Sequence, residues 1–472
     1  MRIYEINTRV HCSNLSEISQ GELKGLSGLG FDAIWLMGMW GISRGVLKIS
    51  KLVSEDFEGS PYAVAEYKFN KKLGGKRQFV ALVERAHRAG LKVIVDFVSN
   101  HMSLDCPWID EHPEFFITSD VRLRPQSTSD YFLHRSGELV AFGRDPYFPP
   151  WHDTAQLDYT SAGLRARMIE TLKRISQYAD GVRCDMAMLV LRDHIRRMWY
   201  PLADRAWFDR RMPGEFWDEA IAEVRKSRPG FLFIAEAYWD KEEDLIELGF
   251  DMAYEKKLYD GLVARDVDLV KQRIARGTRS LERSLNFIEN HDEPRAASVF
   301  SKTNNLAAAA LILSLPGSVL INEGQLEGFT EKLPVQRLKP VTPELPDENL
   351  KRDYLRLLSI TGDDVFTTGE LIAFDTGAFG VISFARIGDG ERAVAYLGQI
   401  SEAWHSFELQ SLDVTALARM LGAVEQIRLT NLLTGDSLIV ECLKSIFTVR
   451  LKDVGVRDEA AFCLLEVSVS EE

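Results

Sequence analysis

Gly181-Val182-Arg183-Cys184-Asp185 decides the fold, because it is a short run of strand character that ends on charged side chains. Three more stretches have this character, namely Asp96-Phe97-Val98-Ser99-Asn100-His101, Ile234-Ala235-Glu236-Ala237 and Glu289-Asn290-His291-Asp292. In a parallel barrel the carboxyl ends of the strands meet on one face. The sequence therefore predicts that three acids, two histidines and one arginine meet in a single pocket.

Outside these stretches, short β-branched runs alternate with amphipathic helical stretches such as Gly75–Ala89 and Leu164–Tyr178, which is typical of parallel βαβ units. The length of 472 residues suits a large α/β barrel with an appendage. We therefore predict a TIM (β/α)8 barrel. Its eight strands are expected at Ile3–Thr8, Ala33–Met37, Lys92–Phe97, Gly181–Cys184, Phe231–Ala235, Phe250–Ala253, Leu285–Ile288 and Val319–Ile321.

Two intervals depart from the barrel pattern. Residues 102–156 contain no barrel-like helix and are rich in Pro, Asp, Ser and aromatic residues, which indicates a small lobe inserted after the third strand. Residues 361–472 contain alternating segments such as 380–385 and 445–450, which are typical of antiparallel strands. We predict a barrel over 1–101 and 157–360, the inserted lobe over 102–156 and a C-terminal antiparallel β-sandwich over 361–472.

Charge and composition narrow the possible partners. The net charge of -13 argues against nucleic acid or an anionic membrane, and no apolar stretch is long enough to cross a bilayer. The start of the chain has no secretory signal pattern. Five scattered cysteines favour a reducing compartment, so the expected location is cytoplasmic; they are Cys12, Cys106, Cys184, Cys442 and Cys463. Strand alternation gives Cys184 a small buried apolar role.

The four charged stretches resemble the signature regions of the α-amylase family of glycoside hydrolases, family 13. The resemblance also covers Gly30–Leu36, Ser60-Pro61-Tyr62, Gln156–Tyr159 and Glu323-Gly324-Gln325, and so extends over the whole chain. It implies the same barrel, inserted lobe and C-terminal β-sandwich.

The resemblance also implies a role for each site residue. Asp185 would be the nucleophile that forms a β-linked glycosyl-enzyme, Glu236 the general acid and base, and Asp292 the third catalytic carboxylate. Substrate binding would fall to Tyr62, His101, Arg183 and His291, and Asp96 would pair with Arg183 or with backbone.

Elementary chemistry supports the first two roles, because a retaining glycosidase needs a nucleophilic carboxylate and a second carboxyl that donates a proton. Arg183 lies two residues before Asp185 and shares its strand face, so it can keep that carboxylate ionised. Clustered acids are expected to raise the pKa of Glu236. The simpler interpretation of a lone acid after a strand is a helix cap.

Several features depart from the family pattern or allow two interpretations. Met188-Leu189 stand where many relatives have Lys-His, which puts acceptor preference in doubt. Asn100 matches a residue often near calcium, but no run of lobe acids indicates a calcium site, so we expect no cofactor and do not favour calcium. Aromatic residues of the lobe would mostly form its own core, with Trp151 and, outside the lobe, Trp239 the better candidates for sugar contacts.

The predicted function is a retaining α-glucosidic hydrolase or transglycosidase that acts on α-glucans, maltooligosaccharides or related α-glucosides. The motifs do not separate hydrolysis from transfer. An α-glucoside isomerase resembling trehalose synthase would need the same three carboxylates and is the alternative. A catalytically silent carbohydrate-binding barrel is less favoured, because all three carboxylates are present. Linkage, chain length and oligomeric state are left open.

Overall fold

The computed structural model describes residues 1–43, 58–120, 122–123, 128–338, 343–376, 380–388, 392–399, 411–422, 425–441, 448–456 and 461–469. Cys442 and residues 445–447 of the second predicted sandwich segment lie outside these ranges. The chain forms two compact units. One comprises Ile3–Tyr254 and Leu333–Thr342, and the other comprises Met1–Arg2, Glu255–Lys332 and Pro343–Glu472. The predicted bounds of barrel, lobe and sandwich stay predictions.

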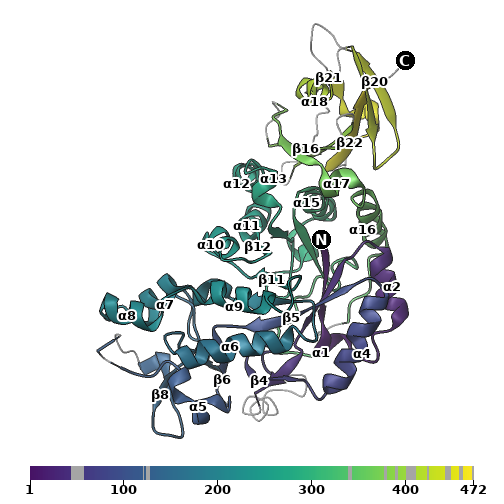
Figure 1. Cartoon of the computed structure of the whole chain (residues 1–472). Coiled ribbons are helices and arrows are strands. Elements are labelled where there is room, and N and C mark those ends of the chain that lie inside the picture. Colours follow the sequence, from purple (N-terminus) through teal and green to yellow (C-terminus); the bar gives the residue numbers. More distant parts are fainter. Residues whose placement is uncertain are drawn as a thin grey trace. The chain divides into compact units, whose positions relative to one another are not determined.

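Eight strands form a closed barrel in the order β1-β14-β13-β12-β11-β10-β5-β2, which confirms the predicted fold class. Figure 1 labels β5, β11 and β12 among them. Their bounds are β1 Arg2–Asn7, β2 Ala33–Met37, β5 Lys92–Val98, β10 Gly181–Asp185, β11 Leu232–Ala235, β12 Met252–Tyr254, β13 Ser284–Asn286 and β14 Ser318–Asn322. Strand β10 pairs in parallel with β5 and with β11. Arg183 therefore lies opposite Asp96 on one side and Ile234 on the other.

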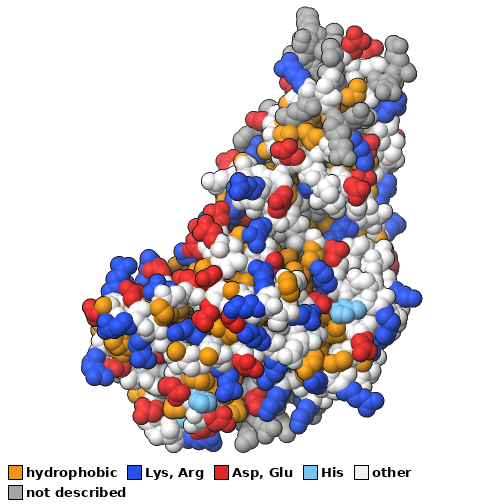
Figure 2. Space-filling model, in the orientation of Figure 1, with side chains coloured by type: hydrophobic (Ala, Val, Ile, Leu, Met, Phe, Trp, Pro, Cys, Tyr) orange, Lys and Arg blue, Asp and Glu red, His pale blue; other side chains and the backbone are white. Residues whose placement is uncertain are grey.

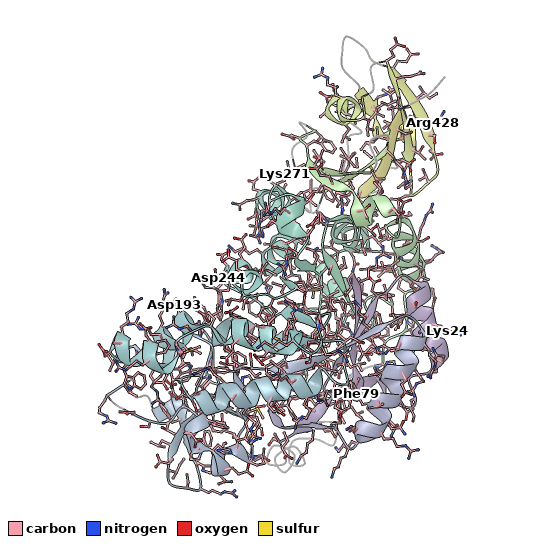
Figure 3. All side chains as sticks on the ribbon, in the orientation of Figure 1. Lys24, Phe79, Asp193, Asp244, Lys271 and Arg428 are labelled. Carbon is pink, nitrogen blue, oxygen red and sulfur yellow. The ribbon has the colours of Figure 1, made fainter. Side chains whose placement is uncertain are left out.

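Amphipathic helices alternate with the barrel strands. Helix α4, Gly75–Arg88, buries Phe79, Leu82, Val83 and Ala86, the residues that its helical period places on one face. Figure 3 labels Phe79 on this helix. Helix α6, Ala162–Ile175, begins where the Ser161 side chain accepts a hydrogen bond from the backbone of Leu164. Other helices are α2 Gln20–Gly28, α7 Arg192–Trp199, α8 Arg205–Arg211, α9 Phe216–Arg225, α10 Glu242–Glu247, α11 Lys256–Ala264, α12 Val267–Ile274, α15 Lys302–Ser314 and α16 Glu348–Ile360.

The predicted insertion after the third barrel strand is present. Its elements are the antiparallel pairs β6 His101–Ser103 with β9 Thr154–Gln156 and β7 Tyr131–Leu133 with β8 Leu139–Ala141, together with the short helix α5 Trp108–Glu111. Phe115 and Phe116 are buried and contribute to the small core expected there, whereas Phe148 is 67% exposed.

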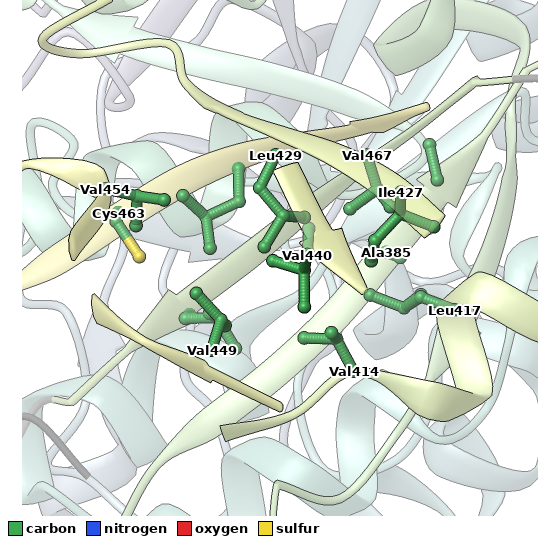
Figure 4. Packing of buried hydrophobic residues seen from close by; sticks show 14 of the residues in the cluster. Ala385, Val414, Leu417, Ile427, Leu429, Val440, Val449, Val454, Cys463 and Val467 are labelled. Carbon is green, nitrogen blue, oxygen red and sulfur yellow. The ribbon is translucent and has the colours of Figure 1, made fainter. Parts of the chain in front are cut away.

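The C-terminal part contains a six-stranded antiparallel sheet in the order β15-β16-β17-β22-β19-β20, and β18 pairs with β21 in a second, smaller sheet. These strands are β15 Glu370–Ala373, β16 Ile382–Ile387, β17 Arg392–Gly398, β22 Phe462–Val469, β19 Gln426–Asn431, β20 Ser437–Glu441, β18 Ser411–Asp413 and β21 Thr448–Arg450. One buried cluster joins residues of both sheets, including Ala385, Leu429, Val449 and Val467 (Figure 4). Packing of two antiparallel layers on a shared core is the predicted sandwich arrangement.

β1 ends one residue earlier and β11 begins one residue later than predicted, whereas β12 begins two residues later and β13 ends two residues earlier than their apolar runs suggest. Phe250 belongs to the turn after α10, where its N–H donates to Leu245, so β12 begins only at Met252. Phe287 and Ile288 are buried, but they follow β13 and do not extend it. Phe250, Phe287 and Ile288 are therefore apolar because they are buried, and not because they pair within the barrel sheet.

The visible surface carries Lys, Arg, Asp and Glu side chains mixed together (Figure 2). Helices in the described ranges lack the combination of length and apolar character that a membrane span requires.

Candidate active site

One buried guanidinium joins three of the acids singled out in the sequence. Arg183 donates to Oδ1 of Asp185 at 2.7 Å, and its other terminal nitrogen lies 2.7 Å from Oε1 of Glu236. Asp96 is 3.7 Å away. The expected pairings of Arg183 with Asp185 and with Asp96 are therefore present. We call Arg183, Asp185, Glu236 and Asp96 the carboxylate group.

Aromatic rings surround the same guanidinium. Its central carbon lies 5.2 Å from the ring centres of Trp35 and Tyr62 and 5.7 Å from that of Tyr254. Such rings attract a cation through their faces. Burial works to lower the pKa of Arg183, but the charge of Glu236 and the neighbouring groups raises that pKa well above its usual value. Arg183 is therefore a fixed positive charge.

Glu236 follows β11 directly and is held at both oxygens. The Tyr238 hydroxyl donates to Oε1 at 2.8 Å, and the backbone N–H of Met186 donates to Oε2 at 2.6 Å. Met186 has a positive φ of 45°, an uncommon conformation for a residue with a side chain. The turn after Asp185 thus presents a backbone donor to the other carboxylate. Glu236 caps no helix, since α10 begins only at Glu242.

Asp96 of β5 accepts a hydrogen bond from the indole of Trp35 on the neighbouring strand β2. Nε1 of Trp35 donates to its Oδ1 at 3.2 Å, and the Asp96 carboxylate is 3% exposed. This contact and the pairing with Arg183 support the structural role expected for Asp96.

His101 is buried at the start of β6. Its ring lies 5.0 Å from that of Trp151, and burial lowers the pKa of His101 although the charges of Asp185 and Asp153 act against it. A hydrogen bond to the Tyr62 backbone also acts against the burial effect. His101 and Tyr62, which are predicted to bind substrate, are therefore neighbours of each other and of the carboxylate group.

His291 and Asp292 belong to the other compact unit, where they follow β13. His291 is buried and its Nε2 lies 2.9 Å from Oδ2 of Asp292, whose side chain is 41% exposed. Backbone N–H groups of Asp292 and Glu293 both donate to the Asn290 side chain, which fixes this turn. The roles predicted for His291 and Asp292 stay predictions.

Three other expectations concern residues beside the carboxylate group. Cys184 is fully buried, and burial raises the pKa of its thiol well above the usual value, so its small apolar role is confirmed. Met188 and Leu189, at the Lys-His positions, are also buried and offer no polar group.

Trp239, a candidate for sugar contacts, has a φ of 60°, and its ring lies 5.0 Å from that of Tyr147 of the lobe.

Asn100, the residue considered for calcium, is engaged by a side chain. Its amide donates to Gln156 at 3.2 Å, and the Gln156 amide donates back at 2.9 Å. Within the described ranges, no three His, Cys, Asp or Glu side chains are grouped as a metal site requires.

Sequence reasoning missed Tyr254, Tyr238 and Met186. The hydroxyl of Tyr254 accepts a hydrogen bond from Nε of Arg183 at 3.3 Å. Tyr254 is the last residue of β12, and this position at a strand end could have marked it as a site residue. Tyr238 lies two residues after Glu236, a spacing that would also have pointed to contact. Nothing in the sequence marks Met186, because methionine rarely adopts a positive φ.

Comparison with known proteins identifies the family of the chain. The family model for the alpha amylase catalytic domain matches residues 14–360. The chain is 23% identical over 336 residues to alpha-amylase MalA of Haloarcula japonica, a match that covers 68% of this chain and 43% of the relative. It is 24% identical over 324 residues to an alpha-1,4-glucan:maltose-1-phosphate maltosyltransferase of Cereibacter sphaeroides, covering 64% of this chain and 46% of the relative. The chain thus spans less than half of each of these relatives.

Among solved structures, the maltogenic alpha-amylase AmyB of Thermotoga neapolitana has a similar fold. The TM-score is 0.72 at 21% identity, and the match covers 100% of this chain and 99% of that one. This likeness concerns the fold, whereas the family model covers most of the chain and includes all four charged stretches. The chain belongs to the alpha-amylase family of glycoside hydrolases.

Proposed function

We propose that the protein is a retaining α-glucosidic enzyme that acts on α-glucans, maltooligosaccharides or related α-glucosides. The observation that carries the proposal is the shared guanidinium of Arg183, which holds Asp185 and Glu236 at 2.7 Å each. Two carboxyl groups on one cation have the proximity that a nucleophile and a proton donor need to act on one glycosidic bond.

In the proposed reaction Asp185 attacks the anomeric carbon while Glu236 protonates the leaving oxygen. A covalent β-glycosyl ester forms at Asp185, and the glycosidic bond to the leaving sugar breaks. Glu236 then takes a proton from water or from an acceptor hydroxyl, which attacks the same carbon and releases Asp185. Two inversions restore the α configuration.

The remaining residues would bind and orient the sugar. Arg183 would orient the Asp185 carboxylate through their hydrogen bond, and Tyr62 would offer an aromatic face to a pyranose ring. His101 and His291 would hydrogen-bond sugar hydroxyls, and Asp292 would favour the distorted, oxocarbenium-like ring. The buried, apolar Met188 and Leu189 give an acceptor no polar contact at those positions.

Product analysis tests the proposal. The protein is incubated with maltose, maltoheptaose, sucrose, trehalose and glucose-1-phosphate, and products are identified by mass spectrometry and NMR. Shorter or longer α-glucosides in the α configuration support hydrolysis or transfer, and exchange between maltose and trehalose identifies an isomerase. If the wild-type chain gives the same products as its Asp185→Asn variant, the proposal is wrong.

A further inference from the structure

A separate pocket lies in the unit that contains the carboxylate group. Its volume is about 450 Å³, and strand β4 Val64–Phe69 and helices α4 and α6 contribute to its walls. Small-molecule sites in proteins commonly enclose about 300–1,000 Å³. Neither Asp185 nor Glu236 lines this pocket, so it is distinct from the proposed active site.

One wall of the pocket is a continuous group of aromatic rings. Trp40 lies 5.5 Å from Tyr67 and 5.3 Å from Phe69 between ring centres, and Phe69 lies 5.8 Å from Tyr178. The rings meet at 66°, 38° and 83° in these three pairs, so the wall offers a ligand both ring faces and ring edges.

Two rings of this wall, those of Trp40 and Tyr67, are hydrogen-bonded to the backbone of barrel strand β5. Nε1 of Trp40 donates to the backbone oxygen of Asp96 at 2.6 Å, and the Tyr67 hydroxyl donates to that of Val98 at 2.6 Å. Both acceptors belong to barrel strand β5. A ligand therefore meets rings that are already ordered, which reduces the entropy lost on binding.

The charged side chains that line the pocket are all basic, namely Lys68, Lys71, Lys76 and Arg174. Lys68 pairs with Glu66 at 2.6 Å, whereas the other three have no salt bridge within the described part of the chain. Nζ of Lys76 lies 4.4 Å from the ring centre of Tyr178, at the aromatic wall itself. Lys76 donates to the Tyr178 hydroxyl at 2.6 Å and Arg174 donates to the Tyr67 carbonyl at 3.1 Å, so both have neutral partners, and positive charge is concentrated here in a chain of net charge -13.

We propose that this pocket binds an organic anion with a planar aromatic body. The body packs against Phe69 and Tyr178, facing one ring and meeting the edge of the other because the two rings are 83° apart, while the anionic group meets Lys71, Lys76 and Arg174. A neutral sugar fits less well, because its hydroxyls need acceptors as well as donors and no Asp, Glu, Asn or Gln side chain is among the lining residues.

The test compares 2-naphthalenesulfonate with neutral 2-naphthalenemethanol by isothermal titration calorimetry at low ionic strength. The sulfonate is expected to bind at one site per chain and at least about fivefold more tightly than the alcohol, because exposed ion pairs contribute modestly. Inorganic sulfate is titrated separately and should bind at least tenfold more weakly than the sulfonate.

Variants locate the site. The double variant Lys71→Gln/Lys76→Gln should weaken sulfonate binding about threefold and leave binding of the alcohol unchanged. Lys24→Gln, an exposed lysine of α2 outside the pocket (Figure 3), is the matched control and should change neither. Tyr178→Ala should weaken both ligands, and thermal melting checks that each variant is folded.

Three results would overturn the proposal: no sulfonate binding, equal affinity for sulfonate and alcohol, or sulfonate binding that the double variant leaves unchanged. Asp185→Asn should bind the sulfonate like the wild type. The outcome therefore does not depend on the proposed catalytic function.

Discussion

Glu236 and Glu255 occupy similar places but differ in their partners. Each directly follows a barrel strand, β11 or β12, and each is 2% exposed. Glu255 lies 2.6 Å from Arg273 and 3.2 Å from Arg276, and the Ser284 hydroxyl donates to it at 3.2 Å. Glu236 instead shares its arginine with two other acids.

We infer from the comparison that charge balance, and not burial, separates Glu236, the proposed catalytic acid, from the structural acid Glu255. Glu255 has two cations for one carboxylate, which is a stabilising arrangement. The carboxylate group has one cation for three acids, and a surplus of buried negative charge costs stability. Such local violations of the rules for stability are expected at functional sites.

The largest expected effect is on turnover. Asp185→Asn removes the attacking carboxylate and should lower kcat on the order of 10⁴–10⁶-fold. It also relieves repulsion around Arg183, so the free energy of unfolding in urea should stay the same or rise. Asp193→Asn on α7 (Figure 3) is the surface control and should change neither property appreciably. A clear loss of stability in Asp185→Asn would contradict the charge-balance interpretation.

Glu255→Gln should show the opposite behaviour. It leaves Arg273 and Arg276 without their carboxylate and should lower the free energy of unfolding by about 2–3 kcal/mol, since both arginines are partly exposed. kcat of the folded fraction should stay within about threefold of wild type, because a group outside the reacting atoms affects turnover little. Glu247→Gln, at an exposed position of α10, is the control. A stable but inactive Glu255→Gln variant would remove the distinction between the two glutamates.

A smaller effect concerns His101, which could act as a second cation if it were protonated. Burial lowers its pKa from 6.5, so the folded state releases this proton at a lower pH than the unfolded chain does. Its stabilising contribution is therefore fully present above about pH 6.5 and is lost as the pH falls below that value.

NMR titration of the His101 ring checks this directly, with a midpoint expected below 6.5. Asp185→Asn should lower the midpoint further, because the Asp185 charge opposes the burial effect. A midpoint above 6.5 would mean that a second cation neutralises the carboxylate group.

The smallest expected effect is that of chelation. Prolonged treatment with EDTA should leave kcat and Tm within error of their starting values, since Asn100 is already hydrogen-bonded to Gln156. A steep loss of activity that calcium restores would show that a metal site supports the fold or the carboxylate group.

Much of the barrel could be predicted because hydrophobic period and charged strand ends are local properties. β2 is found at Ala33–Met37 as expected, and β5 and β10 each extend one residue beyond their predicted ends. Phe250 and Ile288 could not be assigned correctly, because their burial depends on packing and not on strand pairing. An apolar run marks a buried segment, but it does not mark where a strand begins or ends.

Within the candidate site, the pairing of Arg183 with Asp185 could be predicted because residues two apart share a strand face. Contacts of Glu236 with Met186 and of Arg183 with Tyr254 join different strands and depend on register. Glu255 escaped notice because it follows an ordinary apolar segment, and its two arginines lie 18 and 21 residues further along the chain.

The separation of roles between Asp185 and Glu236 is tested most directly with α-glucosyl fluoride and azide. Fluoride leaves with little protonation, so Glu236→Gln, which lacks mainly a proton donor worth about 10²–10⁴-fold, should still form the intermediate. Azide needs no general base and should capture it. Two inversions give the α-glucosyl azide, identified by NMR, whereas Asp185→Asn should give no azide product. Equal inactivity of the two variants, or the β-azide from Glu236→Gln, would contradict the assignment.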